Sequence, residues 1–320
     1  MKTLIILNPH AGSGRAGKLW SKIEPLLWQE LGELVVAVTQ KPGDVAQHLE
    51  KAHDVGLTRV IAIGGDGTNH ALINEMVRIN RHYPDDPPMT FGNLPIGTGQ
   101  DWSRSLGVPQ SPVEAVAWIK AAQSVPLDVG QLTLDDASAD PNNDNQNRQR
   151  NFLNIASVGI SGMITERVNH IRVRRPWTFY QKTLEALLAY RPPHMRVRLD
   201  GKLWYEGTAY ICAVANGRTF GHGMFIAPNA LYDDGLFDVI LIEGVPRLEA
   251  VIALNTIYSG NHLKRSDVHA ARAQTVEIEA GGTPLGMELD GEHSSGQVLR
   301  FEVLPHILKT LASPAILSAT

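Results

Sequence analysis

The first 125 residues alternate short apolar runs with segments of helical spacing, and this alternation limits the fold more than any other feature. The apolar runs predict strands within residues 2–7, 33–40, 59–68 and 90–99. Helical patterns are found between and after them, at residues 16–32, 42–56, 69–80 and 111–122. Strands that alternate with helices predict an α/β domain, in which helices cover both faces of a parallel sheet. Such sheets bind their ligands beyond the carboxyl ends of the strands.

Three glycine-rich segments would meet at that edge, because each of them follows a predicted strand. They are NPHAGSG (8–14), GGDGT (64–68) and PIGTGQD (95–101). Glycine lets backbone N–H groups approach phosphate oxygens without a Cβ in the way, and Thr39 lies on the same edge after the second strand. The pattern therefore predicts a site for a phosphate-bearing ligand. Within it, Thr68 can donate to a phosphate, while Asp66 either meets Mg²⁺ on a nucleotide or shapes its own loop.

The first of these segments comes close to a different phosphate motif. Residues 12–18 spell G-x-x-x-x-G-K, but Leu19 follows where a P-loop needs Ser or Thr to hold Mg²⁺. The segment is therefore a damaged P-loop, another kind of phosphate loop or an ordinary glycine turn. For Lys18, a position on a solvated helix face is the simpler interpretation.

After about residue 126 the pattern changes to dense short strands with glycine turns, which predicts a mainly antiparallel β-sandwich. Residues 135–150 are polar and predict a long exposed loop between two strands. Residues 161–191 have a helical pattern on both sides of Pro176. Their basic and aromatic side chains within 167–182 fit either an anionic membrane surface or a solvated face above core aromatics.

Composition narrows the class of protein further. A formal net charge of −4 argues against a nucleic-acid partner. The single cysteine, Cys212, cannot form an intrachain disulfide and is expected as a small buried hydrophobe. The N-terminus lacks a signal-peptide pattern, and no run approaches the roughly 18 apolar residues of a membrane span. We expect a cytoplasmic protein with at most peripheral membrane contact.

Three segments, in this order and spacing, resemble the diacylglycerol kinase catalytic-domain family, which includes bacterial lipid kinases and sphingosine kinases. They are NPHAGSG, GGDGTNHALINEMV and LPIGTGQDWSRSLG. The resemblance implies the two-domain fold shared with NAD kinase, with a nucleotide domain at 1–125 and a β-sandwich lipid domain at 126–305. The segment 306–320 would return to the first domain. It also implies an ATP- and Mg²⁺-dependent lipid kinase that phosphorylates a lipid alcohol such as diacylglycerol, phosphatidylglycerol or a sphingoid base.

The resemblance assigns roles to individual residues. It makes Glu292 in ELDGEHS the general base, which takes the proton of the lipid hydroxyl, and gives Asp66 a catalytic role. Asp234 in LYDDGLFD would bind a structural Mg²⁺ with the backbone carbonyls of Leu231 and Leu236, although Asp-Gly is also a strong hairpin signal. The nucleotide would be bound by Asn8, Gly12, Gly14, Thr39, Gly64, Gly65, Asp66, Gly67, Thr68, Asn69, His70, Gly97, Thr98 and Asp101.

Two positions depart from the family pattern in the nucleotide half. His70 and Gln100 both stand where the family has asparagine. These changes bear on nucleotide affinity, and they leave two competing functions open: an NAD kinase with a soluble substrate, and a non-catalytic nucleotide- or lipid-binding protein. Oligomeric state is also open, with a homodimer as one expectation.

Overall fold

The computed structural model describes residues 2–41, 43–96, 100–135, 149–169, 178–221 and 223–313. The chain divides into two compact units. The first unit comprises Met1–Asp128 and Pro305–Thr320, and the second unit comprises Val129–Leu304. Two long strands, β5 (Gln123–Asp135) and β15 (Val298–Ala312), each contribute residues to both units.

The first unit begins with the predicted alternation of strands and helices. In chain order its elements are β1 (Thr3–Leu7), α1 (Ala11–Leu31), β2 (Leu34–Val38), α2 (Asp44–Asp54), β3 (Arg59–Gly64), α3 (Asp66–His82), β4 (Thr90–Pro95), α4 (Asp101–Ser105) and α5 (Pro112–Ala121). The continuous apolar runs become central strands because both of their faces are covered. All five residues of β1 are buried, whereas Val35 and Val38 of the outer strand β2 are exposed.

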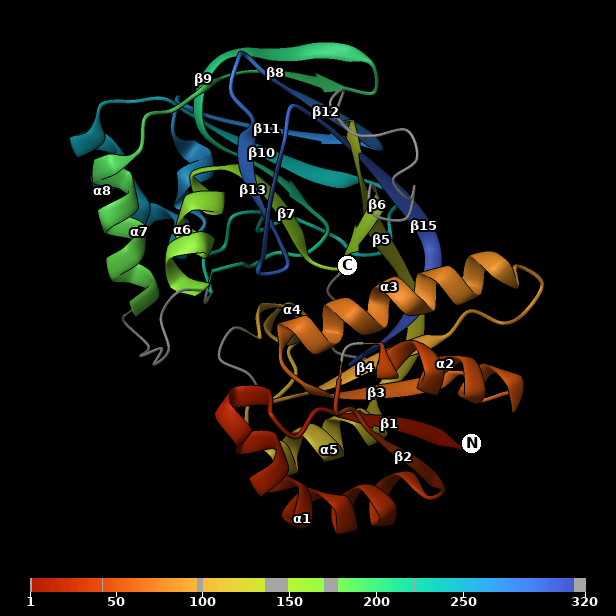
Figure 1. Cartoon of the computed structure of the whole chain (residues 1–320). Helices are drawn as coiled ribbons and strands as arrows, with labels where there is room; N and C mark the ends of the chain where they lie inside the picture. The colour runs from red at the N-terminus through yellow and green to blue at the C-terminus, as the bar shows by residue number, and fades with distance from the viewer. Residues whose placement is uncertain are drawn as a thin grey trace. The chain divides into compact units, whose positions relative to one another are not determined.

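The sheet of the first unit is parallel, in the order β4-β3-β1-β2, and the end of β15 adds to it beside β4. Ile5 lies level with Ile61 on β3 and with Val36 on β2. Helices α1 and α5 contact each other, as do α2 and α3, and Figure 1 shows the two pairs on opposite faces of the sheet. The side chains of α3 that face the sheet, among them Leu72 and Met76, are fully buried. This arrangement confirms the predicted α/β fold and brings the carboxyl ends of four strands to one edge.

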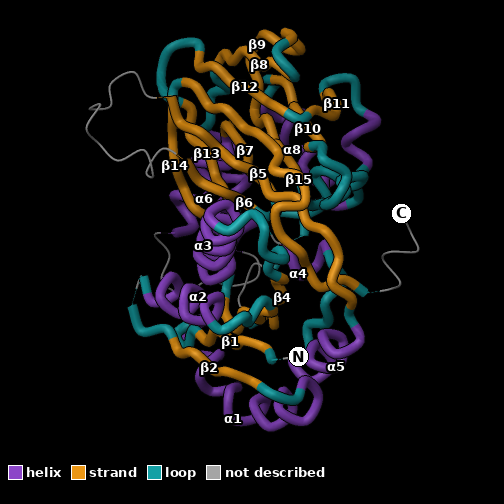
Figure 2. Tube along the Cα trace, turned by 90° about the vertical axis from the view of Figure 1, so that its right-hand side faces the viewer, coloured by secondary structure: helices purple, strands orange, loops and turns teal. Residues whose placement is uncertain are grey.

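The second unit is mostly antiparallel, as predicted. Its elements are β6 (Gln149–Phe152), β7 (Ile155–Gly159), α6 (Ile160–Asn169), α7 (Thr178–Ala189), β8 (His194–Leu199), β9 (Lys202–Ala215), β10 (Phe237–Glu243), α8 (Arg247–Tyr258), the 3-10 helix η2 (Asn261–Lys264), β11 (Val268–Ala273), β12 (Thr275–Ala280), β13 (Leu285–Leu289) and β14 (Glu292–Gly296). In Figure 2 the strands labelled β6 to β14 belong to this unit.

Strand β9 takes part in two sheets, which makes the unit a sandwich. Its first half pairs with β8, next to β12 and β15, and its second half pairs with β7 and β10. The core between the sheets draws on both of them, and Phe152 lies at its centre, with ring centroids 5.7 Å from Phe237 and 6.2 Å from Phe301. Cys212 faces this core, and burial raises the pKa of its thiol to about 12. It is the small buried hydrophobe that the sequence predicts.

Helices α6, α7 and α8 cover the outer face of the second of these sheets. Alternate residues of β9 explain this, because Ala213 and Ala215 pack against the helices while Cys212 and Val214 face the sandwich core. The helices on both sides of Pro176 were predicted. Helix α8 and strand β11 were not, and β15 continues past the predicted strand to Ala312. Helix α8 carries apolar residues on several of its faces. It therefore lacks the amphipathic spacing of apolar residues by which α3 was predicted.

Some predictions lie outside the described residues. They include residues 136–148 of the predicted polar loop, residues 170–177 of the basic and aromatic segment, and Gly97 and Thr98. The strands that flank the loop do pair as an antiparallel hairpin, with Gly130 opposite Phe152. Among the described helices, none is both long and apolar enough to cross a membrane.

Candidate functional site

Asn8, the first residue after β1, connects two of the glycine-rich loops. Its amide Nδ2 donates to Thr68 Oγ1 at 3.0 Å, and its backbone N–H donates to the Ile63 carbonyl at 3.0 Å. Its Oδ1 accepts from the His10 N–H at 3.1 Å. Since the Thr68 oxygen accepts from Asn8, the Thr68 hydroxyl hydrogen is left to donate, which fits a phosphate oxygen.

The backbone between Gly12 and Gly14 adopts a left-handed conformation for three residues in succession. Gly12 has φ 60°, Ser13 φ 58° and Gly14 φ 82°. A Cβ on Gly12 would overlap the carbonyl oxygen of Ile96, which follows the end of β4 and belongs to the third loop. The first and third loops therefore touch at Gly12. Lys18 lies exposed on α1, and Leu19 follows it where a P-loop has Ser or Thr, so the segment is not a P-loop.

We expect Gly12→Ala to weaken nucleotide binding by about tenfold or more, because the new methyl group forces the first and third loops apart. It also costs about 1 kcal/mol of folding free energy from the positive φ. Gly56→Ala is the matched control, since Gly56 has φ 72° and open space around its Cβ position. Nucleotide titration by calorimetry and thermal unfolding separate the two effects. Equal binding by both variants would show that the Gly12–Ile96 contact does not shape the site.

The second loop leads directly into α3, which begins at Asp66. The Thr68 and Asn69 N–H groups donate to the Gly65 carbonyl at 2.9 and 3.1 Å, and a Cβ on Gly64 would overlap the Thr68 side chain. The glycines thus allow the tight strand-to-helix turn. The partial positive charge of a helix N-terminus attracts anions, and Asp66 stands at that end of α3 with a half-buried side chain.

Thr39 and the third loop complete the edge. The Thr39 N–H donates to the Leu7 carbonyl at 2.9 Å, which holds the end of β2 beside the end of β1. Gln100 has a left-handed φ of 59° and precedes α4. Asp101 begins α4 and forms an ion pair with Arg104 at 3.1 Å.

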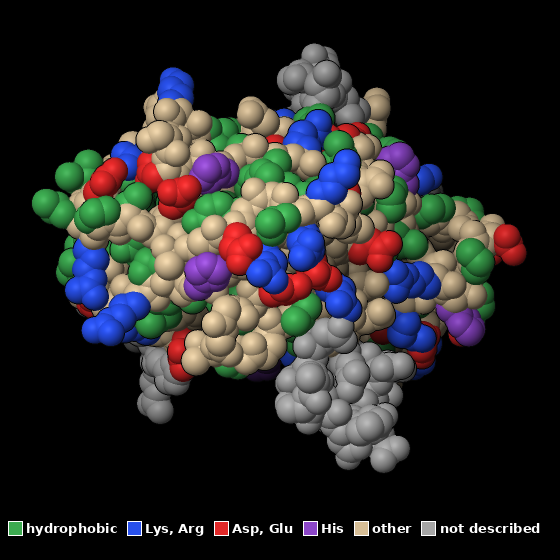
Figure 3. All heavy atoms as spheres, turned by 90° about the horizontal axis from the view of Figure 1, so that it is seen from above, with side chains coloured by type: hydrophobic (Ala, Val, Ile, Leu, Met, Phe, Trp, Pro, Cys, Tyr) green, Lys and Arg blue, Asp and Glu red, His purple; other side chains and the backbone are tan. Residues whose placement is uncertain are grey.

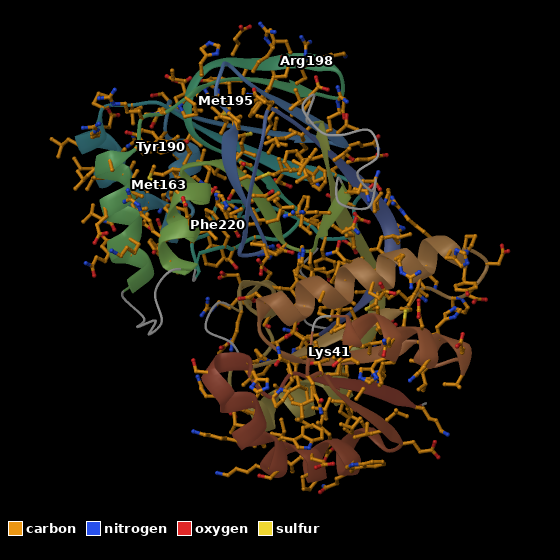
Figure 4. The ribbon with its side chains drawn as sticks, viewed as in Figure 1. Lys41, Met163, Tyr190, Met195, Arg198 and Phe220 are labelled. Carbon is orange, nitrogen blue, oxygen red and sulfur yellow. The ribbon has the colours of Figure 1, made fainter. Side chains whose placement is uncertain are left out.

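Lys41 is a candidate that the sequence analysis missed. It follows Thr39 at the same edge, its side chain is exposed, and Figure 4 labels it. The carboxylate of Asp44 accepts from the backbone N–H groups of Gln40 and Lys41, which lowers its pKa and holds the segment in place. A flexible ammonium at this edge suits a phosphate. The signal available in the sequence was a lysine two positions after a strand-end threonine.

The position that departs from the family at His70 has an unusual environment. The Asn74 amide Nδ2 lies 2.9 Å from the His70 carbonyl and 3.3 Å from His70 Nε2. A carbonyl can only accept, so this amide group is the donor. His70 Nε2 therefore accepts and its Nδ1 carries the hydrogen. That Nδ1, like Asn69 Oδ1, is buried without a hydrogen-bond partner among the residues that the structure describes.

Glu292 stands at the start of β14, in the second unit, immediately after a tight Asp-Gly turn. Asp290 has φ 46° and Gly291 has φ 93°, the signs that a two-residue hairpin requires. The Asp290 carboxylate accepts from the backbone N–H groups of residues 153, 154 and 155 at 2.6, 3.0 and 3.1 Å. Glu288 accepts from the Gly291 N–H at 2.6 Å. The Glu292 side chain is exposed and has no ion-pair or hydrogen-bond partner within the described ranges, while its backbone pairs with Leu289.

The anchored turn continues into a network of buried asparagines. The Asn154 side chain donates to the Thr219 carbonyl at 2.7 Å, and the Asn216 side chain donates to the Leu153 carbonyl at 2.9 Å. The Arg218 guanidinium donates to the Ala230 carbonyl at 3.0 Å. These bonds connect the turn before Glu292 to the loop that leads to Asp234.

Asp234 lies in that loop and not in a hairpin, so the plain Asp-Gly hairpin alternative is wrong for this segment. Its Oδ1 accepts from the Leu236 N–H at 3.1 Å. The Arg272 guanidinium pairs with Asp234 and lies 3.5 Å from Asp238. Burial raises the pKa of Asp238 to about 6. The sequence analysis missed Arg272 because it lies on β11, a strand that was not predicted.

Two family models cover most of the chain. Residues 2–132 match the diacylglycerol kinase catalytic domain, and residues 154–312 match the YegS C-terminal NAD kinase beta sandwich-like domain. The chain belongs to the diacylglycerol kinase catalytic-domain family. It is therefore a kinase, and the sequence resemblance is confirmed.

Curated relatives in this family match over nearly their whole length. The "Probable lipid kinase YegS" of Escherichia coli O9:H4 (strain HS) is 28% identical over 292 residues, which is 90% of this chain and 89% of that protein. The protein of the same name from Escherichia coli (strain SMS-3-5 / SECEC) is 28% identical over 291 residues, with the same coverage of both chains.

Solved structures show the same fold. A diacylglycerol kinase from Bacillus anthracis str. Sterne has a TM-score of 0.69 and 23% identity, with 98% of each chain covered. Another structure from this organism reaches a TM-score of 0.75 at 24% identity and the same coverage. At such low identity these structures support the fold alone.

Proposed function

We propose that the protein is a lipid kinase that transfers the γ-phosphate of ATP to the hydroxyl group of a lipid alcohol. The main support for this proposal is the edge of the sheet in the first unit. There Asn8, Gly12 and Thr68 connect the glycine-rich loops beside the N-terminus of α3. The curated relatives are each named a probable lipid kinase, which supports a lipid as acceptor. Diacylglycerol, phosphatidylglycerol and sphingoid bases are the candidate acceptors.

In this reaction the lipid oxygen attacks the γ-phosphorus, and the bond from that phosphorus to the ADP oxygen breaks. Glu292 takes the hydroxyl proton as the new O–P bond forms. Its carboxylate suits this role because it is exposed and carries no other hydrogen bond among the described residues. The Thr68 hydroxyl and the helix N-terminus at Asp66 hold the phosphates while the proton moves.

A magnesium ion fits the residues around Asp234. The Oδ2 atoms of Asp234 and Asp238 both face the single guanidinium of Arg272, which pairs with the first and lies 3.5 Å from the second, so two carboxylates share one positive charge. No group of three or more metal-binding side chains occurs among the described residues. The ion would therefore be held by Asp234, the carbonyls of Leu231 and Leu236, and water, as Mg²⁺ prefers. When bound, Mg²⁺ neutralises negative charge.

Purified protein incubated with γ-labelled ATP, Mg²⁺ and a panel of acceptors tests the proposal. The panel holds diacylglycerol, phosphatidylglycerol, a sphingoid base and NAD. We expect label on a lipid, and we expect EDTA to abolish it. Label on NAD alone would replace the proposal with the NAD kinase function. Nucleotide binding without any labelled product would indicate a non-catalytic binding protein and would give His70 and Gln100 a functional meaning.

The expected partners follow from this function. The acceptor lipid resides in a bilayer, so we propose peripheral membrane association of a cytoplasmic enzyme, with no nucleic-acid partner. A homodimer remains a proposal that sedimentation measurements can test.

A further inference from the structure

Helix α8 exposes large apolar side chains on its outer face. Leu248 is 74% exposed and Ile252 is 64% exposed, and their four-residue spacing puts them on one side of the helix. Helix α7 contacts α8 and adds Leu188, which is 55% exposed. The opposite side of α8 is already used, because Ala250 and Leu254 pack into the core beneath the helices. The exposed side chains are therefore not needed to hold α8 on its sheet.

Positive charges flank these side chains. Arg191 follows α7 and Arg247 begins α8, and neither has an acidic partner among the described residues. The acidic groups nearby are paired, since Glu185 bonds Lys182 at 2.5 Å and Glu249 bonds Arg265 at 2.9 Å. An apolar strip with unpaired cations at its rim complements an anionic lipid surface, where apolar side chains enter the headgroup region and cations meet lipid phosphates.

Tyr210 on β9 lies close to the end of α7 and is influenced by the charge of Arg247 at the start of α8. The Tyr210 ring centroid is 6.2 Å from that of Tyr190, the residue before Arg191, which Figure 4 labels close to the end of α7. Burial raises the pKa of the Tyr210 hydroxyl, and the positive charge of Arg247 partly offsets this effect. Figure 3 shows hydrophobic side chains at the left edge with Lys and Arg side chains beside them, on the side where Figure 1 draws α7 and α8.

We propose that Leu188, Arg191, Arg247, Leu248 and Ile252 form a docking surface for anionic lipid bilayers. We call these five residues the α7–α8 surface. It differs from the predicted basic and aromatic segment, whose central residues 170–177 lie outside the described part of the chain. The inference rests on the proposed function, because a lipid kinase must reach a bilayer to meet its acceptor. Vesicle binding can nevertheless be measured separately from kinase turnover.

Co-sedimentation with vesicles of phosphatidylcholine containing about a third phosphatidylglycerol tests the surface. We expect the Arg191→Ala/Arg247→Ala variant to bind about 25-fold more weakly, from about fivefold for each cation near an anionic surface. We expect Leu248→Ser/Ile252→Ser to bind at least about tenfold more weakly, from lost apolar insertion. Vesicles of phosphatidylcholine alone should bind all proteins weakly, and high salt should reduce binding of the wild type.

Val55→Ser is the matched control, because Val55 is 72% exposed and lies in the first unit. Unfolding midpoints verify that each variant folds. Equal vesicle binding by the control and both double variants would overturn the proposal. If the wild type is a dimer that Leu248→Ser/Ile252→Ser dissociates while vesicle binding stays intact, the surface binds a second copy of the chain and not a bilayer. Vesicle binding that depends on the surface, without any phosphorylated lipid, would contradict the proposed function and leave this inference standing.

Discussion

Glu292→Gln is expected to lower turnover by about 10²–10⁴-fold, the usual contribution of a general base. Glutamine keeps the size of the side chain but cannot accept the hydroxyl proton. Because the Glu292 side chain is exposed and has no hydrogen-bond partner among the described residues, the unfolding midpoint should stay unchanged. Nucleotide affinity should also persist, since Asn8, Gly12 and Thr68 are untouched. Steady-state kinetics with the acceptor found in the lipid screen provide the measurement.

Glu302→Gln is the matched control, because Glu302 is also an exposed glutamate in the second unit. It should retain full turnover. If Glu292→Gln instead matches the control, Glu292 is a turn carboxylate and another group takes the proton. If Glu292→Gln loses both turnover and folding stability, the side chain supports the turn. Its exposure predicts the opposite, an unchanged stability.

Asp290→Ala is expected to destabilise the protein by roughly 3–5 kcal/mol, because three backbone N–H groups lose a charged acceptor. That loss corresponds to a fall of ~10 °C in the unfolding midpoint. Turnover should fall as well, since the bonds fix the turn from which Glu292 projects. Asp290→Asn should lie between, because asparagine keeps one oxygen acceptor and tolerates the left-handed φ of 46°. Thermal denaturation of the three proteins gives the order.

The chain offers a close internal control for this change. Asp200 has φ 48° and precedes Gly201 in the turn between β8 and β9. Its carboxylate accepts from the backbone N–H groups of Gln274 and Thr275, but in an exposed setting. Asp200→Ala should therefore cost only about 1 kcal/mol. Equal losses at both positions would mean that turn propensity, and not the half-buried carboxylate, stabilises the Asp290 turn.

The local elements of this protein could be predicted because their signals are local. Strands β1, β3 and β4 are recognisable as continuous apolar runs in the sequence, because both faces of a central parallel strand are covered. The amphipathic period of α3 is equally visible. Helix α8 and strand β11 escaped prediction for the converse reason. Leu248 and Ile252 are apolar and exposed, so α8 has no one-sided pattern, and with β11 the partner of Asp238, Arg272, was missed.

By itself, the sequence determined the alternation of strands and helices, the three glycine-rich loops at strand ends and the position of the Asp-Gly-Glu turn. These features follow from periods and spacings of a few residues. Tertiary structure alone decided that Asn8 binds Thr68, that Gly12 meets Ile96, and that Asp290 holds residues 153–155 across more than a hundred positions. The physical reason is that such contacts depend on how elements distant in the chain pack together, and the spacing of residues along the chain does not determine that packing.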